Sequence, residues 1–210
     1  GYRLELEVAG KPARVLLPLL GGFQVSNALC ALALALASGD DAEAATAELE
    51  KLQGVPGRVQ LAGRHPAGAP VYVDYAHTPA ALACVLKALR PHAQGRLHLV
   101  FGCGGDRDSG KRPEMGAIAG KLADVVIVTD DNPRTEDAAD IRAQILAAVP
   151  AAADIGDRAQ AIAEAVNGLG PGDLLVVAGK GHEQGQIIGE ETRPFDDAEA
   201  VGVALKEIGQ

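Results

Sequence analysis

A loop rich in acidic, amide and guanidinium side chains follows an apolar, β-branched run in the middle of the chain. Residues 123–129 form the run, and residues 130–136 read Asp-Asp-Asn-Pro-Arg-Thr-Glu. The run predicts a buried strand, and open α/β sheets bind ligands at the carboxyl ends of their strands. Arg134 can bind a carboxylate through two parallel hydrogen bonds, while Asp131 and the Asn132 carbonyl can accept hydrogen bonds from an ammonium. The segment therefore predicts a binding site for a zwitterion such as an amino acid.

An ordinary strand-to-helix turn is the alternative interpretation of this loop. Pro133 restricts the backbone and biases Asn132 towards an extended conformation, which holds the neighbouring side chains in a defined arrangement. In a plain turn, Thr135 would cap the following helix and Arg134 would lie in solvent. Other loops of the chain help to decide between these interpretations.

Three further strand exits carry polar residues or glycines. Residues 71–79 run from apolar positions into Asp-Tyr-Ala-His-Thr-Pro, residues 97–108 end in a glycine-rich loop, and residues 174–183 end in Gly-Lys-Gly-His-Glu. Glycines let a backbone approach a ligand closely, and Pro79 suits the first position of a helix. Four such strand exits favour a shared ligand site over four unrelated turns.

Four strings at these strand exits together resemble one protein family. They read DYAHTP, FGCGGDRDSGKRP, TDDNPRTE and VAGKGHE. In this order and spacing, the chain closely resembles the carboxy-terminal part of the Mur ligases of peptidoglycan synthesis. The resemblance covers nearly the whole chain, including GGFQVSN at residues 21–27 and GRV at residues 57–59. DNPR is the form of the loop found in family members that add meso-2,6-diaminopimelate.

The resemblance implies an ATP-dependent ligase reaction. In the family, ATP phosphorylates the free γ-carboxylate of UDP-MurNAc-L-Ala-D-Glu, and the amine of the incoming amino acid then attacks the acyl phosphate. The main ATP and Mg²⁺ ligands belong to the family's central domain. We therefore expect no catalytic residue and no metal ligand in this chain, and we expect the chain to be inactive alone. The family also implies a bacterial, cytoplasmic protein.

Matching the motifs residue by residue implies two groups of binding residues. The residues that match the diaminopimelate pocket are Arg107, Asp131, Asn132, Pro133, Arg134, Gly179 and Glu183. In this pocket the arginines would bind carboxylates and the glutamate would bind an ammonium. The residues that match the nucleotide cleft are Asn27, Arg58, Asp74 and His77, with the aspartate on ribose hydroxyls. Without the resemblance, these four would be interpreted as a helix-start amide, a linker salt bridge, a helix cap and a core histidine.

Residues 105–111 match the first seven positions of a phosphate-binding P-loop. The eighth position is Arg112, where a P-loop needs Ser or Thr to hold magnesium. The carboxylates of Asp106 and Asp108 would also repel a phosphate. The segment is therefore interpreted as a different loop, and the resemblance assigns Arg107 to a carboxylate of the incoming amino acid.

The alternation of strand and helix patterns predicts an α/β fold. The strands are expected near residues 71, 97, 125 and 174, and the helices near 79–90, 113–122, 137–149 and 158–167. Such alternation is typical of a mostly parallel sheet with helices on both faces, as in the Rossmann-like C-terminal domain of the family. Near the end, residues 186–195 predict an antiparallel hairpin at the sheet edge, followed by a helix that Asp196 caps.

The start of the chain has a different pattern. It predicts a hairpin and two Ala/Leu-rich helices, a set too small to form complete layers, and Gly and Pro in residues 53–57 indicate a boundary. We therefore expect residues 1–56 to be a remnant of a central ATP-binding domain and residues 57–210 to be an amino-acid-binding C-terminal domain. Because a strand pattern begins at once after Gly1, we interpret the sequence as a fragment.

The composition excludes several classes of protein. The 210 residues carry a formal net charge of −9, whereas nucleic acids and anionic membranes select basic surfaces. No apolar run approaches the length needed to span a bilayer. The three cysteines lack metal-ligand spacing and indicate a reduced, cytosolic setting. We expect Cys30 and Cys84 in the core, and we do not expect Cys103 to act as a nucleophile.

Two other interpretations stay open from the residues alone. The chain could be a stand-alone module that senses an amino acid or a nucleotide without catalysis. It could also belong to a lysine-adding or a folylpolyglutamate-type ligase, although the DNPR loop argues against both. An upstream phosphate loop in the same reading frame would favour a ligase over a binding module.

Overall fold

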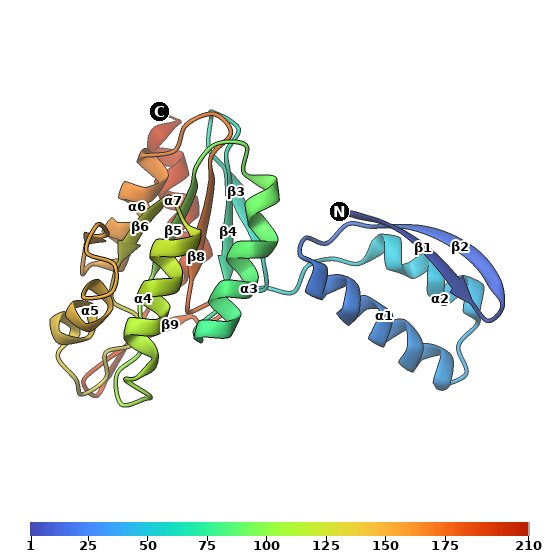
Figure 1. Ribbon diagram of the computed structural model, residues 1–210, viewed down its shortest axis with the longest axis horizontal. Helices are drawn as coiled ribbons and strands as arrows, with labels where there is room; N and C mark the ends of the chain where they lie inside the picture. The colour runs from blue at the N-terminus through green and yellow to red at the C-terminus, as the bar shows by residue number, and fades with distance from the viewer. Residues whose placement is uncertain (210) are drawn as a thin grey trace. The chain divides into compact units, whose positions relative to one another are not determined.

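The computed structural model describes residues 1–209 of the chain. These residues form two compact units, the first spanning Gly1–Val55 and the second beginning at Pro56 (Figure 1). Each unit has its own buried apolar cluster, so each is described by itself.

The first unit contains one hairpin and two helices. Strands β1 (Tyr2–Val8) and β2 (Lys11–Leu17) pair antiparallel around a turn in which Ala9 and Gly10 are both left-handed, with φ of 50° and 75°. Helix α1 is Gly22–Ala37, and α2 (Ala42–Glu48) continues as the 3₁₀ turn Leu49–Lys51. A small core of residues from both strands and both helices holds the unit together.

The second unit is built on a six-stranded sheet in the order β3-β4-β8-β5-β6-β7. The strands are β3 (Gln60–Arg64), β4 (Pro70–Asp74), β5 (Leu97–Phe101), β6 (Val125–Val128), β7 (Ala153–Asp154) and β8 (Leu174–Ala178). All neighbouring pairs are parallel except β3 with β4. Because β8 lies between β4 and β5, the carboxyl ends of four strands meet at one edge of the sheet, where ligands of such sheets bind.

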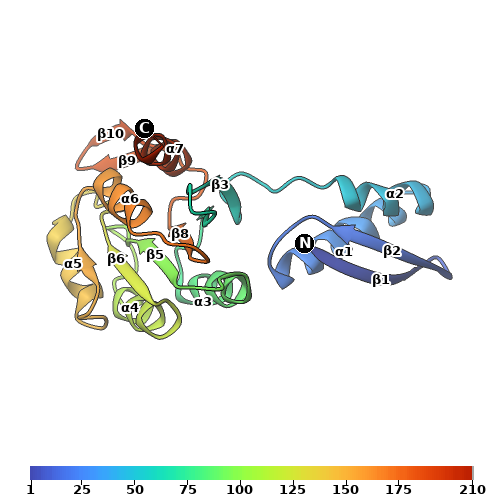
Figure 2. The same cartoon turned by 90° about the horizontal axis from the view of Figure 1, so that it is seen from above.

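Helices cover both faces of this sheet, as the alternating sequence pattern predicted. Helices α3 (Pro79–Leu89) and α4 (Lys111–Leu122) lie on one face, with α5 (Ala138–Leu146) beside α4 (Figure 2). Helices α6 (Arg158–Asn167) and α7 (Asp197–Ile208) lie on the other face, where their apolar side chains pack on the strands. The α/β class with a mostly parallel sheet is confirmed.

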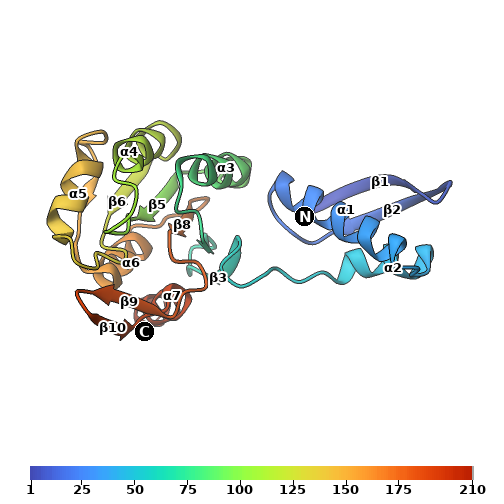
Figure 3. The ribbon, with the colours of Figure 1, turned by 90° about the horizontal axis from the view of Figure 1, so that it is seen from below.

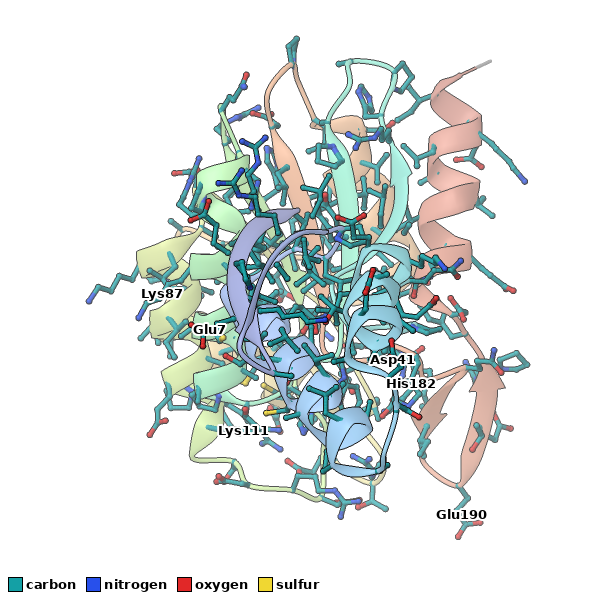
Figure 4. The ribbon with its side chains drawn as sticks, turned by 90° about the vertical axis from the view of Figure 1, so that its right-hand side faces the viewer. Glu7, Asp41, Lys87, Lys111, His182 and Glu190 are labelled. Atoms are coloured by element: carbon teal, nitrogen blue, oxygen red, sulfur yellow. The ribbon has the colours of Figure 1, made fainter. Side chains whose placement is uncertain are left out.

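The hairpin near the end of the chain is not part of the sheet edge, contrary to the prediction. Strands β9 (Gly185–Ile188) and β10 (Glu191–Pro194) form a separate two-stranded sheet, with Glu190 at its tip (Figures 3 and 4). The antiparallel edge strand is instead β3, which the sequence analysis missed. The hairpin lies at the carboxyl ends of the parallel strands, where it contacts the loop after β6.

The cysteine prediction was wrong in part. Cys30 and Cys84 are exposed, whereas Cys103 is buried. Both exposed cysteines lie in helices that are apolar on nearly every side, so their sequence does not reveal which face is buried.

Candidate functional site

A hollow of about 430 Å³ opens at the carboxyl ends of the parallel strands. Its walls come from the loops after β4, β5, β6 and β8, the four strand exits singled out from the sequence. Among the residues that line it are His77, Arg107, Asp131, Asn132, Arg134, Gly179 and Glu183. Of the residues matched to the amino-acid pocket, Pro133 alone does not line the hollow among residues 1–209. The fold thus brings together side chains that are up to 108 positions apart, from Tyr75 to Glu183.

Arg134 is held in a left-handed backbone conformation, with φ of 53°. Its amide donates to Ile187 O at 3.0 Å, and its carbonyl accepts from Gly189 N at 2.7 Å, so the β9–β10 hairpin binds both backbone polar groups of Arg134. Its Nη1 donates to Gly105 O at 2.8 Å. A non-glycine residue in this region carries strain of order 1–3 kcal/mol, and such strain is concentrated at functional sites. These contacts fix the guanidinium at the wall of the hollow.

Asp131 presents a carboxylate with no hydrogen-bond partner among residues 1–209, although the residue as a whole is only 8% exposed. Gly179 lies directly against it. A Cβ at Gly179 would lie 2.7 Å from Asp131 Oδ2, and the φ of Gly179 is 117°, so this position requires glycine. An almost buried carboxylate without a partner favours a cationic ligand group beside it.

Asn132, Lys180 and Glu183 form one hydrogen-bonded network. Lys180 Nζ donates to Asn132 Oδ1 at 3.0 Å and to Glu183 Oε2 at 3.2 Å. Asn132 Nδ2 donates to the same Glu183 oxygen at 2.9 Å, and Asn132 Oδ1 also accepts from Ile187 N at 2.9 Å. The Asn132 side-chain carbonyl therefore accepts from internal donors, not from a ligand as the sequence suggested. Lys180 is fully buried, and the sequence analysis gave it no role.

The loop after β5 packs closely against the loop after β6. Gly105 N donates to Asn132 O at 2.9 Å, and a Cβ at Gly105 would lie 1.9 Å from Pro133 O. Thr135 does not cap a helix: its hydroxyl donates to Asp106 Oδ1 at 2.8 Å. The glycines of this loop therefore serve close packing between loops, and they leave exposed Arg107 at the rim of the hollow.

Arg112 is buried beneath the same loops. It donates to Glu136 Oε1 at 2.8 Å, to Gln144 Oε1 at 3.0 Å and to Gly104 O at 3.3 Å. The hydrogen bond from Arg112 lowers the pKa of Glu136, with a further contribution from the Asp106 amide. Arg112 thus ties helix α4 to two loops of the hollow and to helix α5.

The apparent P-loop does not form a phosphate cradle. Asp108 Oδ1 accepts from Gly110 N at 2.9 Å, and Glu136 Oε1 accepts from Asp106 N at 2.5 Å, so carboxylates already occupy two of the amides. Arg112 lies inward where a P-loop hydroxyl would be needed. Lys111, labelled in Figure 4, lines the hollow and donates to His77 O at 2.9 Å.

A buried ion pair supports the rim from the opposite face of the sheet. Arg158 and Asp197 are fully buried and bonded through two nitrogens, at 2.7 and 2.8 Å. Arg158 also donates to Ala178 O, at the end of β8, at 3.0 Å and to Asp130 O, in the loop after β6, at 3.3 Å. The pair therefore joins α6 and α7 to the ends of β6 and β8.

The residues matched to a nucleotide cleft lie in different surroundings. Asn27 is exposed in the first unit, where its Nδ2 donates to Gln24 Oε1 at 3.1 Å. In the second unit, the Arg58 guanidinium lies 4.9 Å from the centre of the Tyr75 ring, a cation–π contact rather than the alternative salt bridge. His77 is exposed, so it is not a core histidine, and its ring packs against Tyr75 at 4.5 Å.

Asp74 is buried and already hydrogen-bonded. Its two carboxylate oxygens accept from Val59 N and Ala76 N, each at 2.8 Å. Burial raises the pKa of Asp74, an effect that these two hydrogen bonds and the Arg58 charge oppose. The helix-cap interpretation is wrong, because Thr78 caps α3. In this structure Asp74 joins the loop at Val59 to the end of β4.

Three further observations concern the described residues. Burial raises the pKa of the Cys103 thiol to about 12, so this thiol is not a ready nucleophile. Within residues 1–209, no cluster of three or more His, Cys, Asp or Glu side chains is arranged to hold a metal ion. No helix in the same range is both long enough and apolar enough to cross a membrane.

Comparison with known proteins identifies the family. The family model described as "Mur ligase, glutamate ligase domain" matches residues 57–181. The chain belongs to the Mur ligase family. Two similar relatives are both named UDP-N-acetylmuramoyl-L-alanyl-D-glutamate--2,6-diaminopimelate ligase. The protein from Mesorhizobium japonicum is 59% identical over 98% of this chain, and that from Caulobacter vibrioides is 55% identical over 99%.

These relatives are longer than this Mur ligase chain, which spans 42% and 43% of their lengths. A solved structure of a 2,6-diaminopimelate ligase of the same name matches 99% of the chain and 43% of its own length, with 41% identity and a TM-score of 0.74. Mycobacterium tuberculosis folylpolyglutamate synthase, solved with ADP and AMPPCP, matches with 22% identity and a TM-score of 0.69. The latter likeness shows a shared fold.

Proposed function

We propose that this chain is the carboxy-terminal part of an ATP-dependent ligase that adds meso-2,6-diaminopimelate to UDP-MurNAc-L-Ala-D-Glu. Relatives that are 55% to 59% identical carry that name, and the chain aligns with them along nearly its whole length. In this proposal residues 57–210 bind the incoming amino acid. Residues 1–56 are the end of a central ATP-binding domain.

The charges around the hollow support diaminopimelate as the ligand. Diaminopimelate carries two carboxylates and two ammonium groups. The hollow offers the guanidiniums of Arg107 and Arg134, and the carboxylates of Asp131 and Glu183. Glu183 Oε1 has no hydrogen bond among residues 1–209, and neither does the Asp131 carboxylate, so both can accept from ammonium groups. This complementarity is the observation on which the assignment of the ligand rests.

Lysine is the natural competitor, because it has the same two amino groups and no distal carboxylate. A site that presents Arg134 to a carboxylate loses a charge-assisted hydrogen bond when lysine binds and leaves Nε and Nη2 of the guanidinium without a partner among residues 1–209. The proposed site therefore prefers diaminopimelate. The same argument disfavours a folylpolyglutamate-type ligand, which has no second amino group for the paired carboxylates.

In the proposed reaction, ATP supplies the phosphoryl group that turns the γ-carboxylate of the nucleotide substrate into an acyl phosphate. The residues of this chain orient the attacking amine and bind the distal end of the amino acid, which lowers the entropic part of the barrier. Exposed Arg58 and His77, together with half-buried Tyr75, form a cationic and aromatic group that fits a nucleotide and would contact ATP. Asp74 fits a ribose less well, because backbone amides occupy both of its oxygens.

Isothermal titration calorimetry on the chain tests the assignment. We expect meso-2,6-diaminopimelate to bind at least about tenfold more tightly than lysine, a difference of about 1.4 kcal/mol. Pimelate, which has both carboxylates and no amino group, should bind more weakly than diaminopimelate. Equal affinity for lysine and diaminopimelate would refute the assignment of the hollow.

A further inference from the structure

Lys180 is a fully buried lysine next to the hollow. Its ammonium reaches Glu183 Oε2 at 3.2 Å and Asn132 Oδ1 at 3.0 Å. Lysine is among the residues that are almost never fully buried, because removing an ammonium from water costs several kcal/mol unless it is paired. A lysine in this position therefore needs an explanation beyond packing.

The backbone around Lys180 is shaped to place this side chain inside. Gly179 and Gly181 flank it, with φ of 117° and 56°, values that L side chains rarely adopt. A Cβ at Gly181 would lie 2.6 Å from Tyr75 Cβ, and one at Gly179 would lie 2.7 Å from Asp131 Oδ2. The loop thus turns sharply on both sides of a single buried cation.

The hydrogen bonds of Lys180 determine the orientation of its neighbours. Because Asn132 Oδ1 accepts from Lys180 Nζ and from Ile187 N, the other side of the amide, Nδ2, faces Glu183. Glu183 Oε2 then accepts from both Asn132 Nδ2 and Lys180 Nζ. Among residues 1–209 this leaves Oε1 as the Glu183 oxygen free for a ligand, at a side chain that is 35% exposed.

We propose that Lys180 is a positioning residue that, together with Asn132, holds Glu183 Oε2 and so aims Glu183 Oε1 at an ammonium group of the amino-acid ligand. The proposal rests on the proposed function, because it takes diaminopimelate as the ligand. Glu183 lines the hollow, whereas Lys180 is fully buried beside it. Lys180 therefore binds one oxygen of Glu183 without competing for the ligand.

The groups that face this network are few. Glu183 and Asp131 carry negative charge, and Arg158, fully buried from α6, carries positive charge that is paired with Asp197. Arg134 lines the same hollow from the loop after β6. Lys180 is the cation in direct contact with Glu183 among residues 1–209. Removing the Lys180 ammonium should therefore affect the position of the Glu183 carboxylate first.

The experiment measures the affinity for diaminopimelate and for pimelate, which has both carboxylates and no amino group. It compares the wild-type chain with Lys180→Met, which keeps roughly the length of the side chain and removes its charge. Lys180→Gln is the second variant, since it keeps a polar end if the first variant fails to fold. Lys121→Met removes an exposed lysine of α4 and is the matched control. Thermal unfolding confirms that each variant is folded before titration.

We expect Lys121→Met to bind both ligands as the wild type does. In Lys180→Met and Lys180→Gln, diaminopimelate affinity should fall about tenfold or more while pimelate affinity changes much less, because only diaminopimelate has an ammonium group for Glu183 Oε1. A similar loss for both ligands, or no loss, would overturn the positioning role. If the wild type does not bind diaminopimelate at all, the proposed function fails first, and the inference fails with it.

Discussion

Replacing Arg134 tests how the loop after β6 recognises the ligand. Arg134 Nη1 is engaged by Gly105 O at 2.8 Å, while Nε and Nη2 have no partner among residues 1–209. These two nitrogens can bind the distal carboxylate of diaminopimelate. Truncating a desolvated charged pair of this kind costs about 2 to 4 kcal/mol, so Arg134→Ala should weaken diaminopimelate binding on the order of 30- to 1,000-fold.

The substitution also has a structural effect that must be separated from recognition. Alanine at φ of 53° keeps the left-handed strain, whereas glycine removes it, so Arg134→Gly should be more stable than Arg134→Ala by about 1 kcal/mol. If the guanidinium reads the carboxylate, both variants lose diaminopimelate affinity alike, although their melting temperatures differ. Arg134→Lys should recover part of the affinity, because an ammonium cannot reproduce the planar fork.

The assay is calorimetric titration of each variant with diaminopimelate and with lysine. Lysine affinity should hardly change, since lysine has no distal carboxylate. Equal losses for the two amino acids would refute the reasoning and would show that Arg134 supports the loops instead of reading the ligand.

Three further predictions concern glycine, pH and ATP. Gly179→Ala should lower both the ligand affinity and the free energy of unfolding, because the added Cβ would meet Asp131. Gly202→Ala lies in a helix with open space around it, so it should raise the free energy of unfolding by about 0.5 to 1 kcal/mol. Chemical unfolding measures the change in stability of each variant. Burial raises the pKa of Asp173, but hydrogen bonds from backbone amides and His98 outweigh this and lower it to about 2. The stabilisation is present above pH 3.8 and lost as pH falls towards 2, so the stability advantage of wild type over Asp173→Asn should shrink over that range. The chain alone should release no phosphate from ATP above background, and turnover that Lys111→Ala abolishes would contradict the interpretation of residues 105–111.

Much of the fold could be predicted because its strands are short β-branched runs that end in polar loops. Pro79 and Asp196 mark helix starts, and both expected helices are present. Strand β3 was missed, since its five residues mix polar and small side chains, and Leu61 within it is exposed. It is a strand because it pairs with β4, a tertiary effect that overrides weak local preference.

The sequence predicted which loops form the site, but it did not predict the hydrogen-bonded network among their side chains. Arg134 and Glu183 carry chemistry that is visible in their residue types. Lys180 does not, because a lysine between two glycines is usually solvent-exposed, and its burial follows from backbone turns that no local pattern reveals. Arg112 was noticed as a mismatch to a phosphate motif, while its position beneath two loops depends on contacts with distant Gln144.

The backbone hydrogen bonds between the β9–β10 hairpin and Arg134 link ligand binding to local unfolding of the hairpin. Two-stranded hairpins are marginally stable by themselves, and β10 is exposed along its length, so this hairpin should open at a low free energy. Its backbone bonds to Arg134 form and break with the left-handed conformation of that residue. A ligand held by Arg134 should therefore slow exchange of the Gly189 amide, and by reciprocity a substitution at the hairpin tip should change affinity without touching the ligand. The affinity of this chain for its ligand therefore depends in part on the stability of the β9–β10 hairpin, which lies outside the six-stranded sheet.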